Sequence, residues 1–207
     1  MHAVFQPLTR HLVLTGDLMT DIQLFLSANQ CPSTAKHCMD VGAESKRIAL
    51  MFNVDPAAAE IAGWLHDISA VFPNHERIDV ARQLYIEVLP EEEVFPMIIH
   101  QKISKVMAKE IFNITDPNIL NAVGCHTTLR SNSSLLDRVL FVADKIAWDQ
   151  DGTPPFIDDL NRNLKESLTH GAFAYLHFLW ERKETLKVIH PWLRDAYEDL
   201  KDKVRLV

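Results

Sequence analysis

The chain has 207 residues, of which 47% are hydrophobic, 24% are charged and only six are glycine, a composition typical of a folded, helix-rich single domain. The formal net charge of −7 argues against a broad binding surface for duplex nucleic acid or for an anionic membrane. No signal-type N-terminus and no run of about 18 apolar residues occur, so we expect a cytoplasmic protein without a membrane-spanning helix.

Three helices are predicted in the first third of the chain. Asp17 and Asp21 indicate the start and the exposed face of a helix within an N-terminal extension, residues 1–30. A second helix is predicted at residues 33–52. The third, residues 55–69, reads DPAAAEIAGWLHDIS; its Asp-Pro pair favours a helix start, and its apolar residues recur at helical spacing.

The middle of the chain continues the helical pattern. The acidic stretch PEEEVF, residues 90–95, indicates a solvated loop or a helix start, and a helix is predicted at residues 102–113. The segment DPNILNAVGCHTT, residues 116–128, repeats the Asp-Pro start. The segment SSLLDRVLFVADKIAW, residues 133–148, predicts an amphipathic helix capped by its first or second serine.

A break is predicted at residues 149–156, DQDGTPPF, because its glycine and two prolines forbid a continuous helix. Further helices are predicted at 156–168, 172–189 and 190–204. The sequence therefore predicts an all-α fold, with a core over residues 30–150 and C-terminal helices over residues 151–207. The three cysteines form no CxxC pair, which disfavours a disulfide framework or a thiolate zinc site.

Six residues of metal-binding type lie beside or inside these apolar segments: His37, His66, Asp67, His100, His126 and Asp144. An unpaired buried carboxylate costs several kcal/mol or shifts its pKa until it is neutral, and a shared metal ion removes that cost. Adjacent helical residues project about 100° apart, so His66 and Asp67 can share an ion only at its edge, with other helices completing the shell. The second oxygen of Asp67 can then bridge to another ion.

Nitrogen and oxygen donors without thiolate suit iron, manganese, zinc, nickel or cobalt, and ligand type alone does not choose among them. Two such ions, roughly 3.5 to 4 Å apart in proteins generally, can clamp phosphate oxygens for in-line displacement. The predicted reaction is therefore hydrolysis of a phosphoester or phosphoanhydride. Lys102, Arg130 and Lys145 are the nearest cations in the sequence for a polyphosphate substrate.

The order of these residues, the segment CHTTLRSNSSLLDRVLFVADKI and the later LKVIHPWLRDAYEDL resemble the HD-domain phosphohydrolases. More narrowly, from about residue 30 to the C-terminus, they resemble the YqeK family of symmetrical bis(5'-nucleosyl)-tetraphosphatases. The resemblance implies an HD-domain helical bundle with two divalent metals, iron in the family. It also implies hydrolysis of diadenosine tetraphosphate to two ADP by a metal-activated hydroxide, with Asp67 catalytic.

The same resemblance implies the ligand sets. The first metal would be held by four residues: His37, His66, Asp67 and Asp144. The second would be held by Asp67 with His100 and His126. Asp67 would thus belong to both metals.

Several interpretations stay open at this stage. Many family members continue after ADKI with an E-P-x-R segment, whereas this chain reads AWDQDGTPPF and lacks that arginine. The substrate can therefore be another nucleotide or phosphoester, or the chain a non-catalytic nucleotide- or metal-sensing module. Thr127 and Thr128 can each donate to a phosphate or end a helix, and His190 can approach a nucleotide or mark a helix boundary. A homodimer is a further expectation, with a nucleotide as the small-molecule partner.

Overall fold

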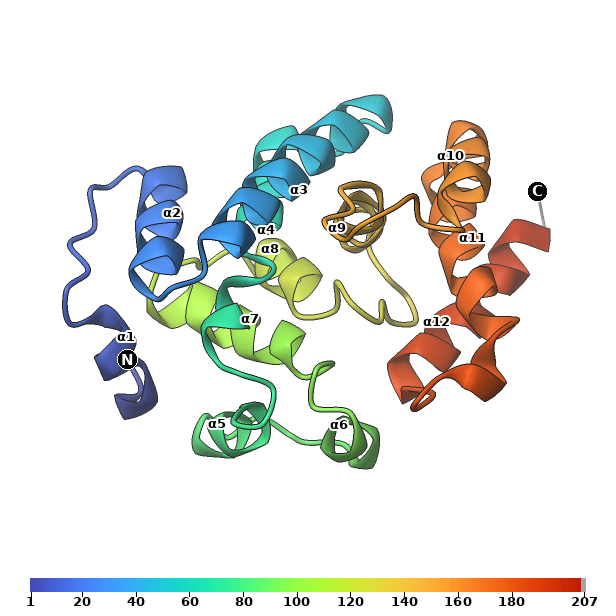
Figure 1. The fold of residues 1–207 in the computed structure, drawn as a ribbon. Helices are drawn as coiled ribbons and strands as arrows, with labels where there is room; N and C mark the ends of the chain where they lie inside the picture. The colour runs from blue at the N-terminus through green and yellow to red at the C-terminus, as the bar shows by residue number, and fades with distance from the viewer. Residues whose placement is uncertain (206–207) are drawn as a thin grey trace.

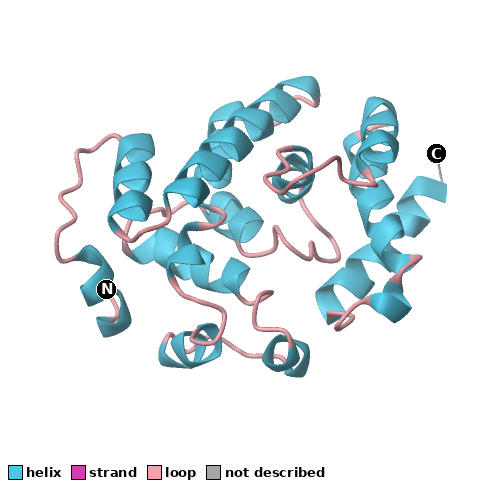
Figure 2. Ribbon diagram, viewed as in Figure 1, coloured by secondary structure: helices cyan, strands magenta, loops and turns pink. Residues whose placement is uncertain are grey.

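The fold is all-α, as the sequence predicted. In a computed structural model, which describes residues 1–205, the chain forms α-helices and short 3₁₀-helices and no strand (Figures 1 and 2). The α-helices are α1 (Gln6–Thr9), α2 (Leu18–Ala28), α3 (Pro32–Met51), α4 (Pro56–Leu65), α5 (Arg77–Gln83), α6 (Pro90–Val94), α7 (His100–Glu110), α8 (Pro117–Val123), α9 (Leu135–Ile146), α10 (Ile157–Glu166), α11 (Leu168–Trp180) and α12 (Pro191–Arg205). The 3₁₀-helices are η1 (Ala3–Phe5), η2 (Ile68–Val71) and η3 (Lys183–Thr185). None of the described helices is both long and apolar enough to cross a membrane.

The helix starts follow the predicted capping chemistry. The Asp55 carboxylate accepts hydrogen bonds from the backbone N–H groups of Ala57 and Ala58 at the start of α4. Asp116 accepts in the same way at the start of α8. The second of the two serines, Ser134, caps α9 in a reciprocal capping box.

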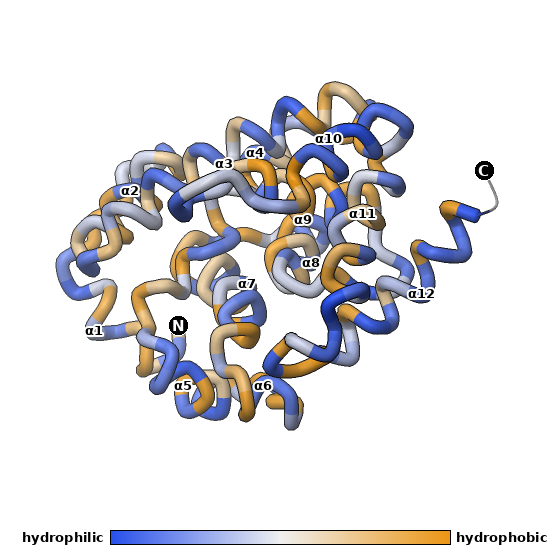
Figure 3. Tube along the Cα trace, turned by 45° about the vertical axis from the view of Figure 1, so that its right-hand side comes forward, coloured by the Kyte–Doolittle hydropathy of each residue, from blue (hydrophilic) through white to orange (hydrophobic). Residues whose placement is uncertain are grey.

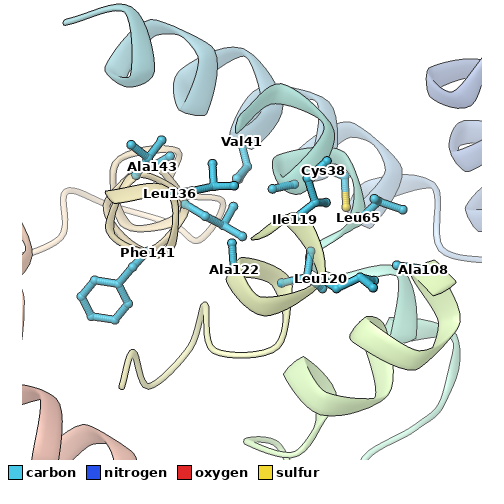
Figure 4. Packing of buried hydrophobic residues seen from close by; sticks show 14 of the residues in the cluster. Cys38, Val41, Leu65, Ala108, Ile119, Leu120, Ala122, Leu136, Phe141 and Ala143 are labelled. Atoms are coloured by element: carbon cyan, nitrogen blue, oxygen red, sulfur yellow. The ribbon is translucent and has the colours of Figure 1, made fainter. Parts of the chain in front are cut away.

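The centre of the fold is the pair α3 and α4, which packs against α8 and α9 (Figure 1). Apolar side chains of these helices, among them Cys38, Val41 and Leu65, fill the space between them (Figure 4). The backbones of α3 and α4 touch at two glycines: a Cβ on Gly63 would lie 2.5 Å from the Cα of Gly42. This close approach brings the middle of α3 next to the end of α4.

The two ends of the chain pack on opposite sides of this centre (Figure 1). Phe5 and Phe25 from the N-terminal region are fully buried, and the ring of Phe25 meets Phe112 edge-on at 5.6 Å. At the other end, α11 packs against both α9 and α12, with Trp180 stacked on Tyr197 at 4.5 Å. Hydrophobic and hydrophilic stretches alternate along the helices (Figure 3), as amphipathic helices require.

The structure adds detail to three sequence interpretations and corrects two of them. Asp21 does not lie on an exposed face; its buried carboxylate accepts hydrogen bonds from Thr15. The stretch 90–95 is a helix start, but Glu92 within it is fully buried rather than solvated. The helix predicted at 172–189 ends at Trp180, and a 3₁₀-turn and an extended segment follow.

Candidate metal centre

The six candidate ligands converge on one place although they come from five separate parts of the chain. They lie as follows: His37 in α3, His66 at the C-terminal cap of α4, Asp67 directly after it, His100 at the start of α7, His126 in the turn after α8, and Asp144 in α9. The close packing of α3 on α4 brings His37 beside His66. The helix ends bring the other two histidines to the same side.

One group of donor atoms forms around Asp144. Its Oδ1 lies 3.3 Å from His37 Nε2 and 3.5 Å from His66 Nε2, and the two Nε2 atoms are 3.3 Å apart. A second group forms around Asp67. Its Oδ1 lies 3.0 Å from His100 Nε2 and 3.4 Å from His126 Nε2, and these two Nε2 atoms are 2.9 Å apart.

Asp67 faces both groups. While its Oδ1 belongs to the second group, its Oδ2 lies 3.6 Å from the Nε2 of His66 in the first group. Two carboxylate oxygens directed to two sets of imidazole nitrogens are the arrangement of a bridging ligand. Donor atoms close enough to hold an ion occur in the set His37, His66 and Asp67, and likewise in the set Asp67, His100 and His126.

The spacing of the donor atoms fits a metal. With metal–nitrogen bonds of about 2.1 Å, neighbouring ligands of a tetrahedral or octahedral ion lie about 3.0 to 3.4 Å apart. The distances between donor atoms within both groups lie at or close to this range. By contrast, ring nitrogens that are not bonded through a proton or a cation repel one another at such separations.

The histidine tautomers support the same conclusion for the second group. The Nδ1 atoms of His100 and His126 each lie within hydrogen-bond distance of a backbone carbonyl, which leaves a lone pair on each Nε2 of the neutral ring. Burial lowers the pKa of His126 to about 4, so this ring is neutral at pH 7. The lone pair of His126 Nε2 therefore faces His100 Nε2 at 2.9 Å, a contact that requires a shared proton or a metal ion between the two nitrogens.

The charges at the centre also call for a cation. Burial works to raise the pKa of Asp67, but the positive charge and hydrogen bonds of the neighbouring histidines outweigh it and hold that pKa well below its usual range. For His66, burial works to lower the pKa, yet Asp67 and Asp144 raise it well above the usual value. Two ionised carboxylates here are therefore matched by a proton or by a metal ion.

Most of these ligands open into a cavity of about 360 Å³. Its wall also contains Lys145, Thr127, Trp148 and Tyr175. The indole Nε1 of Trp148 is buried without a hydrogen-bond partner. Tyr175 was not predicted: it lies in the apolar helix α11, where nothing in the local sequence distinguishes it from a core residue.

The structure separates the three candidate cations. Lys145 lines the cavity and pairs with Asp144. Lys102 and Arg130 instead line a different cavity of about 270 Å³. There Lys102 Nζ lies 2.8 Å from the buried Glu92, and Arg130 Nη2 lies 2.8 Å from the buried Asp137.

The two threonines and His190 also differ in position. Thr127 lines the cavity with the metal-type ligands, whereas Thr128 is buried and exchanges hydrogen bonds with Gln101. His190 is buried before α12, and its Nε2 lies 3.3 Å from Glu92, next to Lys102 rather than to the six ligands.

Comparison with known proteins identifies the family. The family model of the HD domain matches residues 34–149, more than half of the chain. A protein of Lactococcus lactis subsp. cremoris, the uncharacterized protein in the pepC 5' region, is 46% identical over 151 residues, which cover 73% of this chain and 76% of that protein. The symmetrical bis(5'-nucleosyl)-tetraphosphatase of Bacillus subtilis is 25% identical over 153 residues, covering 72% of this chain and 80% of that enzyme.

A solved structure shares the whole architecture. The crystal structure of a predicted HD superfamily hydrolase involved in NAD metabolism from Clostridium acetobutylicum superposes with a TM-score of 0.78 at 25% identity. The superposition covers 92% of this chain and 99% of that protein. The chain therefore belongs to the HD domain family, as its resemblance predicted, and is an HD-domain hydrolase.

Proposed function

We propose that this protein is a two-metal phosphohydrolase that cleaves diadenosine tetraphosphate symmetrically into two ADP. The observation that carries the proposal is the pair of donor groups joined by the two oxygens of Asp67 at the wall of a cavity. In this assignment one ion is held by His37, His66, Asp67 and Asp144. The other is held by Asp67, His100 and His126.

The cavity has the groups that a nucleoside polyphosphate needs. Lys145 supplies a positive charge for phosphate oxygens, and the Thr127 hydroxyl supplies a donor. Trp148 and Tyr175 offer aromatic surface for a base, and the unpartnered indole N–H of Trp148 offers one more donor. The name of the Bacillus subtilis relative supports this choice of substrate.

The chemistry that two bound divalent ions supply is Lewis acidity, which activates water for attack and polarises phosphoryl oxygens. The protein's own residues position the metal ions and balance their positive charge. Asp67 and Asp144 stay ionised at pH 7 because their pKa values are held low against the effect of burial by the surrounding cations. Addition of one water molecule across the central anhydride of the substrate yields two ADP.

The test is product analysis with metal-loaded protein. Anaerobically purified protein loaded with Fe²⁺ or Mn²⁺ is incubated with diadenosine tetraphosphate in H₂¹⁸O, and products are separated by chromatography and weighed by mass spectrometry. We expect ADP alone, with one ¹⁸O atom in half of it. Asp67→Asn is the matched variant; loss of the bridging charge is expected to reduce metal content and to lower kcat/KM at least about a hundredfold, beyond the effect usual for outer-shell partners.

Other results would revise the proposal. AMP with ATP as products would overturn the symmetrical cut. An intact dinucleotide together with hydrolysis of another nucleotide or phosphoester would overturn the substrate and leave the hydrolase class in place. Tight nucleotide binding without turnover under any metal would favour the sensing module.

A further inference from the structure

The four histidines of the centre differ in how their second ring nitrogen is held. Three of them have Nδ1 within hydrogen-bond distance of the carbonyl three residues earlier: His66 to Gly63 at 2.7 Å, His100 to Met97 at 2.5 Å and His126 to Val123 at 2.9 Å. His66 and His126 follow the C-terminal ends of α4 and α8, where the last carbonyls lack helical partners, and the carbonyl that His100 contacts belongs to Met97, before α7 begins. The carbonyl fixes the tautomer and aims each Nε2 at the site.

His37 is the exception. It lies inside α3, where the carbonyls of the preceding turn already accept helical hydrogen bonds. Its Nδ1 is buried and has no hydrogen-bond partner. The local backbone therefore cannot orient this ring, and a group from elsewhere in the chain has to do so.

Asp149 is the group within reach. Its Oδ2 lies 3.9 Å from His37 Nδ1, and both residues line the same two cavities. The Asp149 carboxylate is 55% exposed, so it is free to move the roughly 1 Å that separates this distance from a hydrogen bond. Asp40 also lines one of these cavities, but Lys36 already pairs with its carboxylate.

We propose that Asp149 is the positioning residue of His37: it accepts the hydrogen bond from Nδ1–H and thereby directs Nε2 to the metal beside Asp144. Carboxylate–histidine–metal arrangements of this kind are common in metalloproteins. The inference rests on the metal centre of the proposed function. It also gives a role to Asp149 within the segment where the chain departs from the E-P-x-R pattern.

Metal affinity gives a direct test that does not depend on turnover. Mn²⁺ binding is measured by chelator competition for the wild type, Asp149→Ala, Asp149→Asn and the control Asp151→Asn, an exposed carboxylate two residues further on. We expect Asp149→Ala to weaken one of the two equivalents by about 10- to 100-fold. The amide oxygen of Asp149→Asn can still accept the hydrogen bond, so its loss is expected to be smaller, and the control is expected to match the wild type.

A spectroscopic readout separates positioning from a general loss of structure. In Zn²⁺-loaded protein with ¹⁵N-labelled histidine, the His37 ring is expected to carry its proton on Nδ1 in the wild type. Asp149→Ala is expected to shift the His37 ¹⁵N signals and leave those of His66, His100 and His126 in place.

Failure of this inference is distinguishable from failure of the proposed function. Wild-type protein that binds no Mn²⁺ would overturn both. Wild-type protein with two equivalents, and Asp149→Ala with unchanged affinity and unchanged His37 signals, would overturn only the role of Asp149. An equal loss for both ions together with a lower Tm of the metal-free protein would show that Asp149 acts on the fold rather than on His37.

Discussion

Lys145 combines burial with a charge at the edge of the candidate centre. Burial works to lower its pKa, but the Asp144 carboxylate outweighs this and raises that pKa above the usual value, so the ammonium group persists at neutral pH. Lys145 is the basic side chain that lines this cavity, where it pairs with Asp144. Lys102 and Arg130 line a different cavity and pair with the buried carboxylates of Glu92 and Asp137. A phosphate group in the cavity would therefore meet the charge of Lys145.

Replacing Lys145 tests this assignment. We expect Lys145→Met to lower kcat/KM for diadenosine tetraphosphate by about a hundredfold, the scale of losing one electrostatic contact to a phosphoryl group. Steady-state kinetics give the value, with metal content measured on the same sample because Asp144 is a neighbour. Lys105→Met, from the other cavity, is the control and is expected to stay within about twofold; equal losses in both variants would contradict a specific role for Lys145.

At the scale of elements, the centre depends on how closely α3 and α4 approach. Gly42 and Gly63 let the two backbones touch, and a side chain on either would collide with the other helix. His37 lies five residues before Gly42 on α3, and His66, the C-terminal cap of α4, lies three residues after Gly63. The spacing of their Nε2 atoms is therefore set by a contact between helices that involves neither histidine.

A methyl group at this contact is expected to affect both stability and metal binding. The Cβ of Gly63→Ala would lie 2.5 Å from Gly42 Cα, so the helices must separate, at a cost of about 1 to 3 kcal/mol in the free energy of unfolding. Urea unfolding and Mn²⁺ competition check the two effects. Gly124→Ala is the control, because its Cβ would meet the flexible side chain of Lys105, and we expect a smaller change in stability and metal affinity. A Gly63→Ala variant with unchanged stability and metal affinity would refute the close contact.

On the scale of the whole molecule, local chemistry was predictable and distant pairing was not. The ligands were found because His and Asp stood beside apolar runs in a family order, and the helix starts because Asp-Pro and Ser-Ser cap locally. The burial of Glu92 was not predicted because its partners are Lys102, ten residues away, and His190, nearly one hundred residues away. The helix predicted through 181–189 ends instead at Trp180, and the segment that follows carries His190 to its distant partner Glu92.

This network joins α6, α7 and the start of α12, and its effect on stability depends on pH. Burial works to raise the pKa of Glu92, but hydrogen bonds from His190, Lys102 and Leu89 lower it below the usual 4.5. A carboxyl group with a lowered folded-state pKa stabilises the fold above its unfolded pKa, and this contribution is lost as pH falls through the folded value. The stabilisation should therefore be complete near pH 6 and should decline below about pH 4.5.

Glu92→Gln removes that contribution and leaves the buried Lys102 without its counter-charge. We expect the free energy of unfolding to fall by about 3 kcal/mol at pH 7, and the gap to the wild type to narrow below pH 4.5. Urea unfolding from pH 7 to pH 3.5 in the presence of a metal chelator measures this gap. Because His126 titrates in both proteins, its contribution cancels when the free energy of unfolding of the variant is subtracted from that of the wild type. Glu93→Gln removes an exposed ion pair with Arg82 and is expected to cost less than about 1 kcal/mol. A gap that stays constant down to pH 3.5 would show that the Glu92 carboxylate does not provide the pH-dependent part of the stability.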